Sequence, residues 1–113
     1  MVIDLIIPTY KPGDKFQESL KRLALQTRKP DRIILVNTEA EFFDEKMITP
    51  YDNVEVHHIK KEEFDHGKTR DYGASLAKEA DILMFMTDDA IPKDKYMVEN
   101  LLTVTRIRND SAS

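Results

Sequence analysis

Two adjacent carboxylates, Asp88 and Asp89, follow the apolar run 82–86. They are the first candidates for residues with a chemical role. Carboxylates at the end of a buried strand cost free energy unless a cation or hydrogen-bond donors compensate them. Mg²⁺ or Mn²⁺ suits such a place, because these ions bind one or two carboxylates together with substrate phosphates. The alternative is a turn whose aspartates cap the helix expected after Pro92. The spacing alone leaves both interpretations open.

A basic segment around Gly67 is the second candidate. A glycine lets the backbone approach a ligand closely. Lys68 and Arg70 lie near the start of an expected helix, where they could bind phosphate oxygens. The alternative is a solvated basic turn that balances the acidic residues just before it.

The segment Pro8-Thr9-Tyr10 is the third candidate, and it follows the first apolar run. The Tyr10 ring could stack on a flat ligand ring, and Thr9 could donate a hydrogen bond to one. The alternative is the ordinary end of a strand.

Short apolar runs alternate with amphipathic segments, which is typical of a parallel sheet covered by helices on both faces. Pro8 is expected to end the first strand, because proline cannot donate to a strand ladder. Phe85 and Met86 are expected to lie in the core. Such sheets bind ligands beyond the carboxyl ends of their strands, where all three candidates fall. We expect strands at 2–7, 33–36, 54–59 and 82–86, and helices at 15–27, 41–48, 69–80 and 93–105.

Composition narrows the class of protein. The 113 residues suffice for one domain, and a formal charge of -4 gives no bulk attraction to nucleic acid or an anionic membrane. The absence of cysteine excludes disulfide scaffolds, thiolate metal sites and thiol nucleophiles, and favours a cytoplasmic setting. No apolar run is long enough for a transmembrane helix. With only three glycines, the sequence contains neither a dinucleotide-binding nor a P-loop glycine motif.

Four segments in order resemble the N-terminal, nucleotide-sugar-binding part of a family 2 glycosyltransferase, which has the GT-A fold. The resemblance covers about residues 2–105. The third and fourth segments resemble the rhamnosyltransferase-like branch in particular. The segments are 3–13, with the opening Ile7-Pro8-Thr9-Tyr10, then 20–36, 64–74 and 85–92.

The resemblance implies a role for each matching position. Asn37 or Thr38 stands where the family usually has a base-binding aspartate, and Arg70 would reach the nucleotide or its diphosphate. A bound Mg²⁺ or Mn²⁺ would be held mainly by Asp89. The implied nucleotide-sugar-binding residues are Pro8, Thr9, Tyr10, Asn37, Thr38, Lys68, Arg70 and Asp88, and the implied metal-binding residues are Asp89 and Asp88.

The implied fold is a truncated three-layer α/β/α sandwich with a mainly parallel sheet. Residues 1–105 would form the donor-binding half and 106–113 a disordered tail. The implied activity is inverting transfer of a sugar from a UDP- or dTDP-linked donor to a saccharide or lipid-linked acceptor. No catalytic base is expected within this chain, because the family's base lies in the acceptor half, beyond Ser113. The resemblance implies a role in the synthesis of cell-surface polysaccharide. The implied location is the cytoplasm, at the inner face of the membrane.

The main alternative is a non-catalytic α/β binding or dimerisation module of the same fold, in which an exposed sheet edge supports a homodimer. A receiver-like signalling domain is a weaker alternative. It needs an acidic pair after the first strand, where this sequence has Pro8-Thr9-Tyr10.

Overall fold

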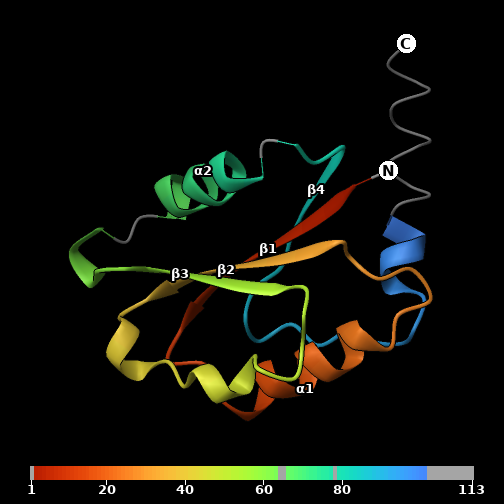
Figure 1. Ribbon diagram of the computed structural model, residues 1–113, viewed down its shortest axis with the longest axis horizontal. Helices are drawn as coiled ribbons and strands as arrows, with labels where there is room; N and C mark the ends of the chain where they lie inside the picture. The colour runs from red at the N-terminus through yellow and green to blue at the C-terminus, as the bar shows by residue number, and fades with distance from the viewer. Residues whose placement is uncertain (1, 64–65, 78, 102–113) are drawn as a thin grey trace.

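The computed structural model describes residues 2–63, 66–77 and 79–101. Within these residues, four parallel strands form one sheet in the order β3-β2-β1-β4 (Figure 1). The strands are β1 (Ile3–Tyr10), β2 (Arg32–Thr38), β3 (Val54–Ile59) and β4 (Ile82–Phe85). The helices are α1 (Asp14–Ala24) and α2 (His66–Leu76), with short 3₁₀ helices η1 (Ala40–Phe42), η2 (Glu45–Met47) and η3 (Lys61–Glu63). Residues 97–101 are also helical. None of the helices in these ranges is long and apolar enough to cross a bilayer.

The sheet separates two hydrophobic cores, and α1 and α2 lie on its opposite sides (Figure 1). Side chains alternate along β1, so that Leu5 packs in the core beneath α1 whereas Ile6 packs in the core beneath α2. The buried α1-side core contains Ile3, Leu5, Ile7, Phe16, Leu20, Leu23, Ile33, Leu35, Phe43, Ile82, Met84 and Val98. This arrangement confirms the predicted α/β class with a parallel sheet between helices.

The helix α2 lies unusually close to β1. A Cβ atom placed on Gly73 would be only 2.5 Å from the Cγ2 atom of Ile6, which is a buried side chain. A residue larger than glycine could therefore not occupy this position without displacing the helix or the strand. The middle of α2 therefore packs directly on the middle of β1.

The first strand is longer than predicted, because Pro8 does not end it. β1 continues to Tyr10, and Pro8 lies opposite Val36 of β2 in the ladder. The pairing of β1 with β4 stops earlier, at Ile6 and Phe85. A proline is tolerated in a strand where one side carries no ladder hydrogen bonds, and Pro8 lies beyond the last residue paired with β4.

Several helix boundaries also differ from the prediction. α1 ends at Ala24 because the buried Gln26 side chain donates to the Arg22 carbonyl oxygen at 3.2 Å, satisfying an acceptor of the last turn. α2 begins at His66, so Lys68 lies in a helical turn and not in a loop. The helix predicted at 41–48 is instead the two 3₁₀ helices η1 and η2. The end of the helix predicted at 93–105, and the predicted tail 106–113, lie outside the described residues.

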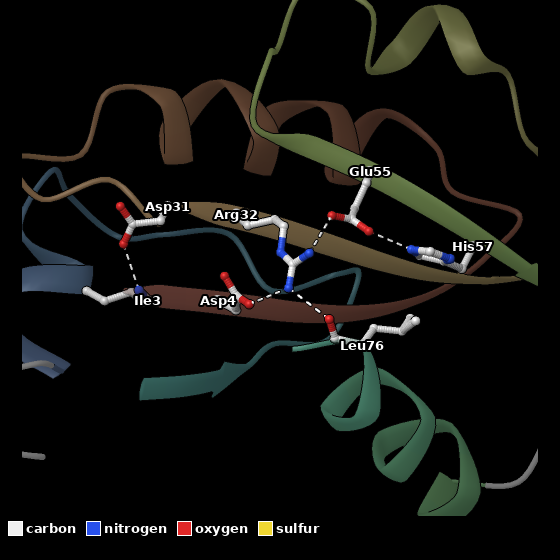
Figure 2. Close-up of polar contacts among 7 residues, drawn as sticks. All are labelled: Ile3, Asp4, Asp31, Arg32, Glu55, His57 and Leu76. Carbon is white, nitrogen blue, oxygen red and sulfur yellow. Dashed lines mark hydrogen bonds and ion pairs between the residues drawn. The ribbon is translucent and has the colours of Figure 1, made fainter. Parts of the chain in front are cut away.

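A chain of ion pairs ties the amino-terminal half of the sheet to the end of α2 (Figure 2). The Arg32 guanidinium donates to Asp4 at 2.8 Å, to Glu55 at 3.1 Å and to the Leu76 carbonyl oxygen at 2.8 Å. The hydrogen bond to Asp4 raises the pKa of Arg32 above its usual value. Glu55 in turn contacts His57 at 2.6 Å. Arg32, on β2, is therefore joined to β1, to β3 and to the end of α2, at the end of the sheet opposite the predicted site.

Candidate functional site

A cavity of about 540 Å³ lies beyond the carboxyl ends of β1 and β4. The strand order reverses at this point, because β2 and β3 lie on one side of β1 and β4 lies on the other. Open parallel sheets bind ligands in the crevice at such a reversal, and the volume is in the range of small-molecule sites. Three segments line the cavity, namely the end of β1, the first turn of α2 and the end of β4 with the turn after it. The lining residues are Pro8, Thr9, Tyr10, Thr69, Arg70, Phe85, Met86, Thr87 and Asp88.

Five of the predicted nucleotide-sugar-binding residues line this cavity: Pro8, Thr9, Tyr10, Arg70 and Asp88. They come from parts of the sequence that are far apart. The fold brings them together because both strands and the start of α2 meet at the same edge of the sheet.

Asn37 is not among the residues that line the cavity, but it contacts Thr9, which is. Its side chain is fully buried and accepts a hydrogen bond from the Thr9 hydroxyl at 2.8 Å. Its amide nitrogen donates to the Glu39 carbonyl oxygen at 3.2 Å and lies 3.2 Å from Nδ1 of His58. Because these contacts occupy both ends of the amide, we assign Asn37 the role of positioning Thr9.

Two further predicted binding residues also lie outside the lining of the cavity. Thr38, the last residue of β2, is buried, and its hydroxyl has no partner among the described residues. Lys68 is exposed on the first turn of α2. Of the predicted basic pair on this turn, only Arg70 lines the cavity.

The two aspartates of the turn after β4 occupy different positions. Asp88 lines the cavity and accepts a hydrogen bond from the Tyr10 backbone N–H at 3.2 Å, which joins the ends of β4 and β1. Asp89 accepts from the Thr87 hydroxyl at 2.8 Å and lines a neighbouring hollow of about 290 Å³ beside the start of α1. Asp88 borders both spaces.

These carboxylates fit a divalent cation that is bound together with a phosphorylated ligand. No cluster of three or more histidine, cysteine, aspartate or glutamate ligands occurs in the part of the chain that the structure describes. Mg²⁺ does not need one, because it typically takes one or two carboxylates and completes its shell with water and substrate phosphates. Asp88 has the position for this role, since it faces the cavity that Arg70 also lines.

Arg70 lies on the apolar wall of the cavity. Its Cζ atom is 5.0 Å from the centre of the Phe85 ring. A cation–π contact uses the face of the ring and leaves the N–H donors of the guanidinium available for an anion. Phe85 was predicted to be in the core but is 39% exposed. The reason is that α2 packs on residues of β1 and β2, such as Ile6 and Val36, and leaves this face of β4 uncovered.

Two residues that directly follow strands have a left-handed backbone. Lys11, directly after β1, has φ 46° and Glu39, directly after β2, has φ 69°. Residues other than glycine adopt this conformation at an energetic cost, and such strain is concentrated at functional sites. The Lys11 amine lies 4.6 Å from the centre of the Phe42 ring and 5.2 Å from that of Tyr10. An aromatic and a cationic group, Phe42 and Lys11, thus lie beside Tyr10 at the cavity.

Four residues of the cavity wall were not predicted as site residues: Thr69, Phe85, Met86 and Thr87. The signal for Thr69 was present in the sequence. Thr69, Gly73 and Ala77 are spaced four residues apart, so they form one face of α2, and all three are buried. The exposed position of Phe85 could not be read from its strand, because which face of β4 a helix covers depends on tertiary packing.

Comparison with known proteins defines the class. Residues 4–111 match the family described as glycosyl transferase family 2, so the chain belongs to this family. It is 31% identical over 102 residues to the O-antigen chain rhamnosyltransferase RfbN of Salmonella typhimurium, covering 90% of this chain. It is 30% identical over 109 residues to the O-antigen chain rhamnosyltransferase WbaN of Salmonella anatum, covering 96% of this chain. The matched regions span only 32% and 34% of these two relatives.

Solved structures of similar fold include S. aureus TarS 1–349 in complex with UDP-GlcNAc. It superimposes with a TM-score of 0.70 at 22% sequence identity, over 91% of this chain and 30% of TarS 1–349. The same protein in complex with UDP gives a TM-score of 0.69 at 22% identity, over 91% of this chain and 31% of the other. At this level of identity the likeness establishes the GT-A fold and nothing about ligands.

Proposed function

We propose that this chain is the donor-binding part of an inverting, metal-assisted family 2 glycosyltransferase that takes a UDP- or dTDP-linked sugar. The observation that carries the proposal is the cavity at the β1–β4 strand reversal, which places a guanidinium, Arg70, and a carboxylate, Asp88, around one space. The names of the two relatives favour rhamnose as the sugar and an O-antigen chain as the product. The TarS structures of similar fold were solved in complex with UDP and with UDP-GlcNAc, and we carry this ligand class over to the present chain only as part of the proposal.

Each side chain of the cavity has a defined part in the proposal. Tyr10 and the aromatic and cationic groups beside it hold the nucleoside, with Thr9 oriented by Asn37. Arg70 binds the diphosphate, whose negative charge grows when the bond to the sugar breaks. A preorganised cation at that point stabilises the leaving group without reorganisation of solvent.

Asp88 would hold the divalent cation, with Asp89 next to it in the same turn. The resemblance gives the main role to Asp89, and we give it to Asp88 because only Asp88 of the two lines the cavity that Arg70 also lines. Once bound, such an ion neutralises charge on the leaving diphosphate. The acceptor in the proposal is a saccharide or a lipid-linked saccharide, and none of the described residues is assigned to it or to the general base that deprotonates it. A cytoplasmic location at the inner face of the membrane is part of the proposal and is compatible with a chain that contains no cysteine.

Replacing Asp88 with asparagine is the direct test of the metal-assisted part. Calorimetric titration with UDP and with dTDP should show tighter binding in Mn²⁺ than in its absence. In the presence of Mn²⁺, Asp88→Asn should weaken the binding of UDP and dTDP about tenfold, equivalent to about 1.4 kcal/mol. The fold should be unchanged, because the asparagine amide oxygen can still accept the Tyr10 N–H.

Two matched variants make this test specific. Asp89→Asn should have a smaller effect, because Asp89 lines the neighbouring hollow. Asp52 is an exposed residue in the turn before β3, and Asp52→Asn removes the same charge as Asp88→Asn. This variant should bind UDP and dTDP as wild type does. Nucleotide affinity that is indifferent both to Mn²⁺ and to Asp88→Asn would contradict the assignment.

A further inference from the structure

One polar side chain in the wall of the cavity is buried without a hydrogen-bond partner. Thr69 is 3% exposed, its hydroxyl oxygen is buried and makes no hydrogen bond among the described residues, and Thr69 is one of the residues that line the cavity. Among the described residues, the other buried side-chain oxygen atoms without a hydrogen-bond partner belong to Asp4 and Thr38, and neither residue lines this cavity. A buried hydroxyl with no partner destabilises the protein, so a group that enters the cavity and accepts from it would gain affinity.

Packing places Thr69 there without the help of its hydroxyl. It belongs to the buried face of α2 that also includes Gly73, which has no room for a Cβ atom because Ile6 packs against it. A valine has nearly the same shape as threonine, and an apolar group of the same shape can replace a buried hydroxyl that has no partner at little cost. The hydroxyl is therefore a group that the ligand-free fold does not use.

The surroundings of Thr69 indicate the chemistry of the missing partner. The next residue, Arg70, lines the same cavity and brings a positive charge to the first turns of α2. The amino end of a helix also favours negative charge. A hydroxyl donor beside a guanidinium suits an anionic oxygen, which accepts shorter and stronger hydrogen bonds than a neutral one.

We propose that the Thr69 hydroxyl donates a hydrogen bond to a diphosphate oxygen of the nucleotide donor and so helps to position the leaving group. This inference rests on the proposed function and assigns it a residue outside the predicted set. Thr69 acts together with Arg70, the hydroxyl fixing the direction of the diphosphate and the guanidinium supplying the charge.

The test compares Thr69→Val and Thr69→Ser with wild type in titrations with UDP, with uridine and with inorganic pyrophosphate, all in Mn²⁺. Thr69→Val should weaken UDP and pyrophosphate binding by about tenfold, as expected for a lost hydrogen bond to a charged group. Uridine binding should be unchanged, and Thr69→Ser should keep most of the UDP affinity. The unfolding temperature of ligand-free Thr69→Val should equal or exceed that of wild type.

Three outcomes would overturn the proposal. Equal UDP affinity of wild type and Thr69→Val would show that the hydroxyl is not used. An equal loss for UDP and uridine would place the contact at the nucleoside. A lower unfolding temperature of the ligand-free valine variant, with UDP affinity retained, would show that the hydroxyl serves the fold. Failure of wild type to bind UDP and dTDP would instead contradict the proposed function, and the two failures are therefore distinguishable.

Discussion

Replacing Arg70 with alanine is expected to weaken UDP and dTDP binding by roughly 10- to 100-fold, the range for hydrogen bonds to a charged group. Arg70 is the one cationic residue among those that line the cavity in the described chain. Its contact with the face of the Phe85 ring keeps the guanidinium at the wall of the cavity and leaves its N–H donors available for the diphosphate. Titration calorimetry of wild type and variant measures the loss.

The controls separate charge from geometry. Arg70→Lys should recover only part of the affinity, because an ammonium group cannot form the two parallel hydrogen bonds of a guanidinium. Lys21→Ala removes one positive charge from an exposed position of α1 and should leave binding unchanged. If Arg70→Ala and Lys21→Ala reduce UDP affinity equally, the effect is one of net charge and Arg70 does not contact the diphosphate.

Replacing Arg32 with methionine is expected to lower the free energy of unfolding by about 3 kcal/mol, near the lower end of the range for breaking a buried ion pair. Asp4 is 1% exposed, and its Oδ2 atom accepts from Arg32 while its Oδ1 atom has no partner among the described residues (Figure 2). The variant would leave this carboxylate buried without a counter-charge. It would also remove the hydrogen bond from Arg32 to the Leu76 carbonyl oxygen at the end of α2.

This prediction is checked by measuring the free energy of unfolding in urea for wild type, the two single variants and the double variant. Asp4→Leu alone should cost less than Arg32→Met, because Arg32 is partly solvated and keeps its bond to Glu55. The double variant Asp4→Leu/Arg32→Met should recover most of the stability lost in Arg32→Met, because no buried charge remains. An Arg32→Met variant within about 1 kcal/mol of wild type would show that the pair behaves like a surface ion pair, contrary to the expectation.

The sequence predicted the parallel sheet between helices well, for a physical reason. Four short apolar runs could bury both faces only in a parallel sheet between helices, and such a sheet fixes where ligands bind. The carboxyl-end residues Tyr10, Arg70 and Asp88 follow directly from that topology. The family comparison supports the same arrangement.

Other features depended on tertiary packing and could not be predicted. Pro8 continues β1 because β4 stops pairing two residues before it, and no local pattern reports where a neighbouring strand ends. Asn37 follows an apolar run at a strand end, as a binding residue would, but its amide contacts Thr9 and His58 inside the protein. The position of Phe85 in the cavity wall depends on which strands α2 covers.

The most direct test of the central claim is amide chemical-shift mapping of the isotope-labelled chain by NMR, with UDP and with dTDP in the presence of Mg²⁺. The account predicts shifts that saturate with nucleotide and are concentrated at the end of β1, the first turns of α2 and the turn after β4, around Tyr10, Arg70 and Asp88. A second cavity, of about 630 Å³, lies at the opposite edge of the sheet and includes Asp4 and Arg32 in its lining. Shifts concentrated there, or no saturable shifts with either nucleotide, would contradict the account.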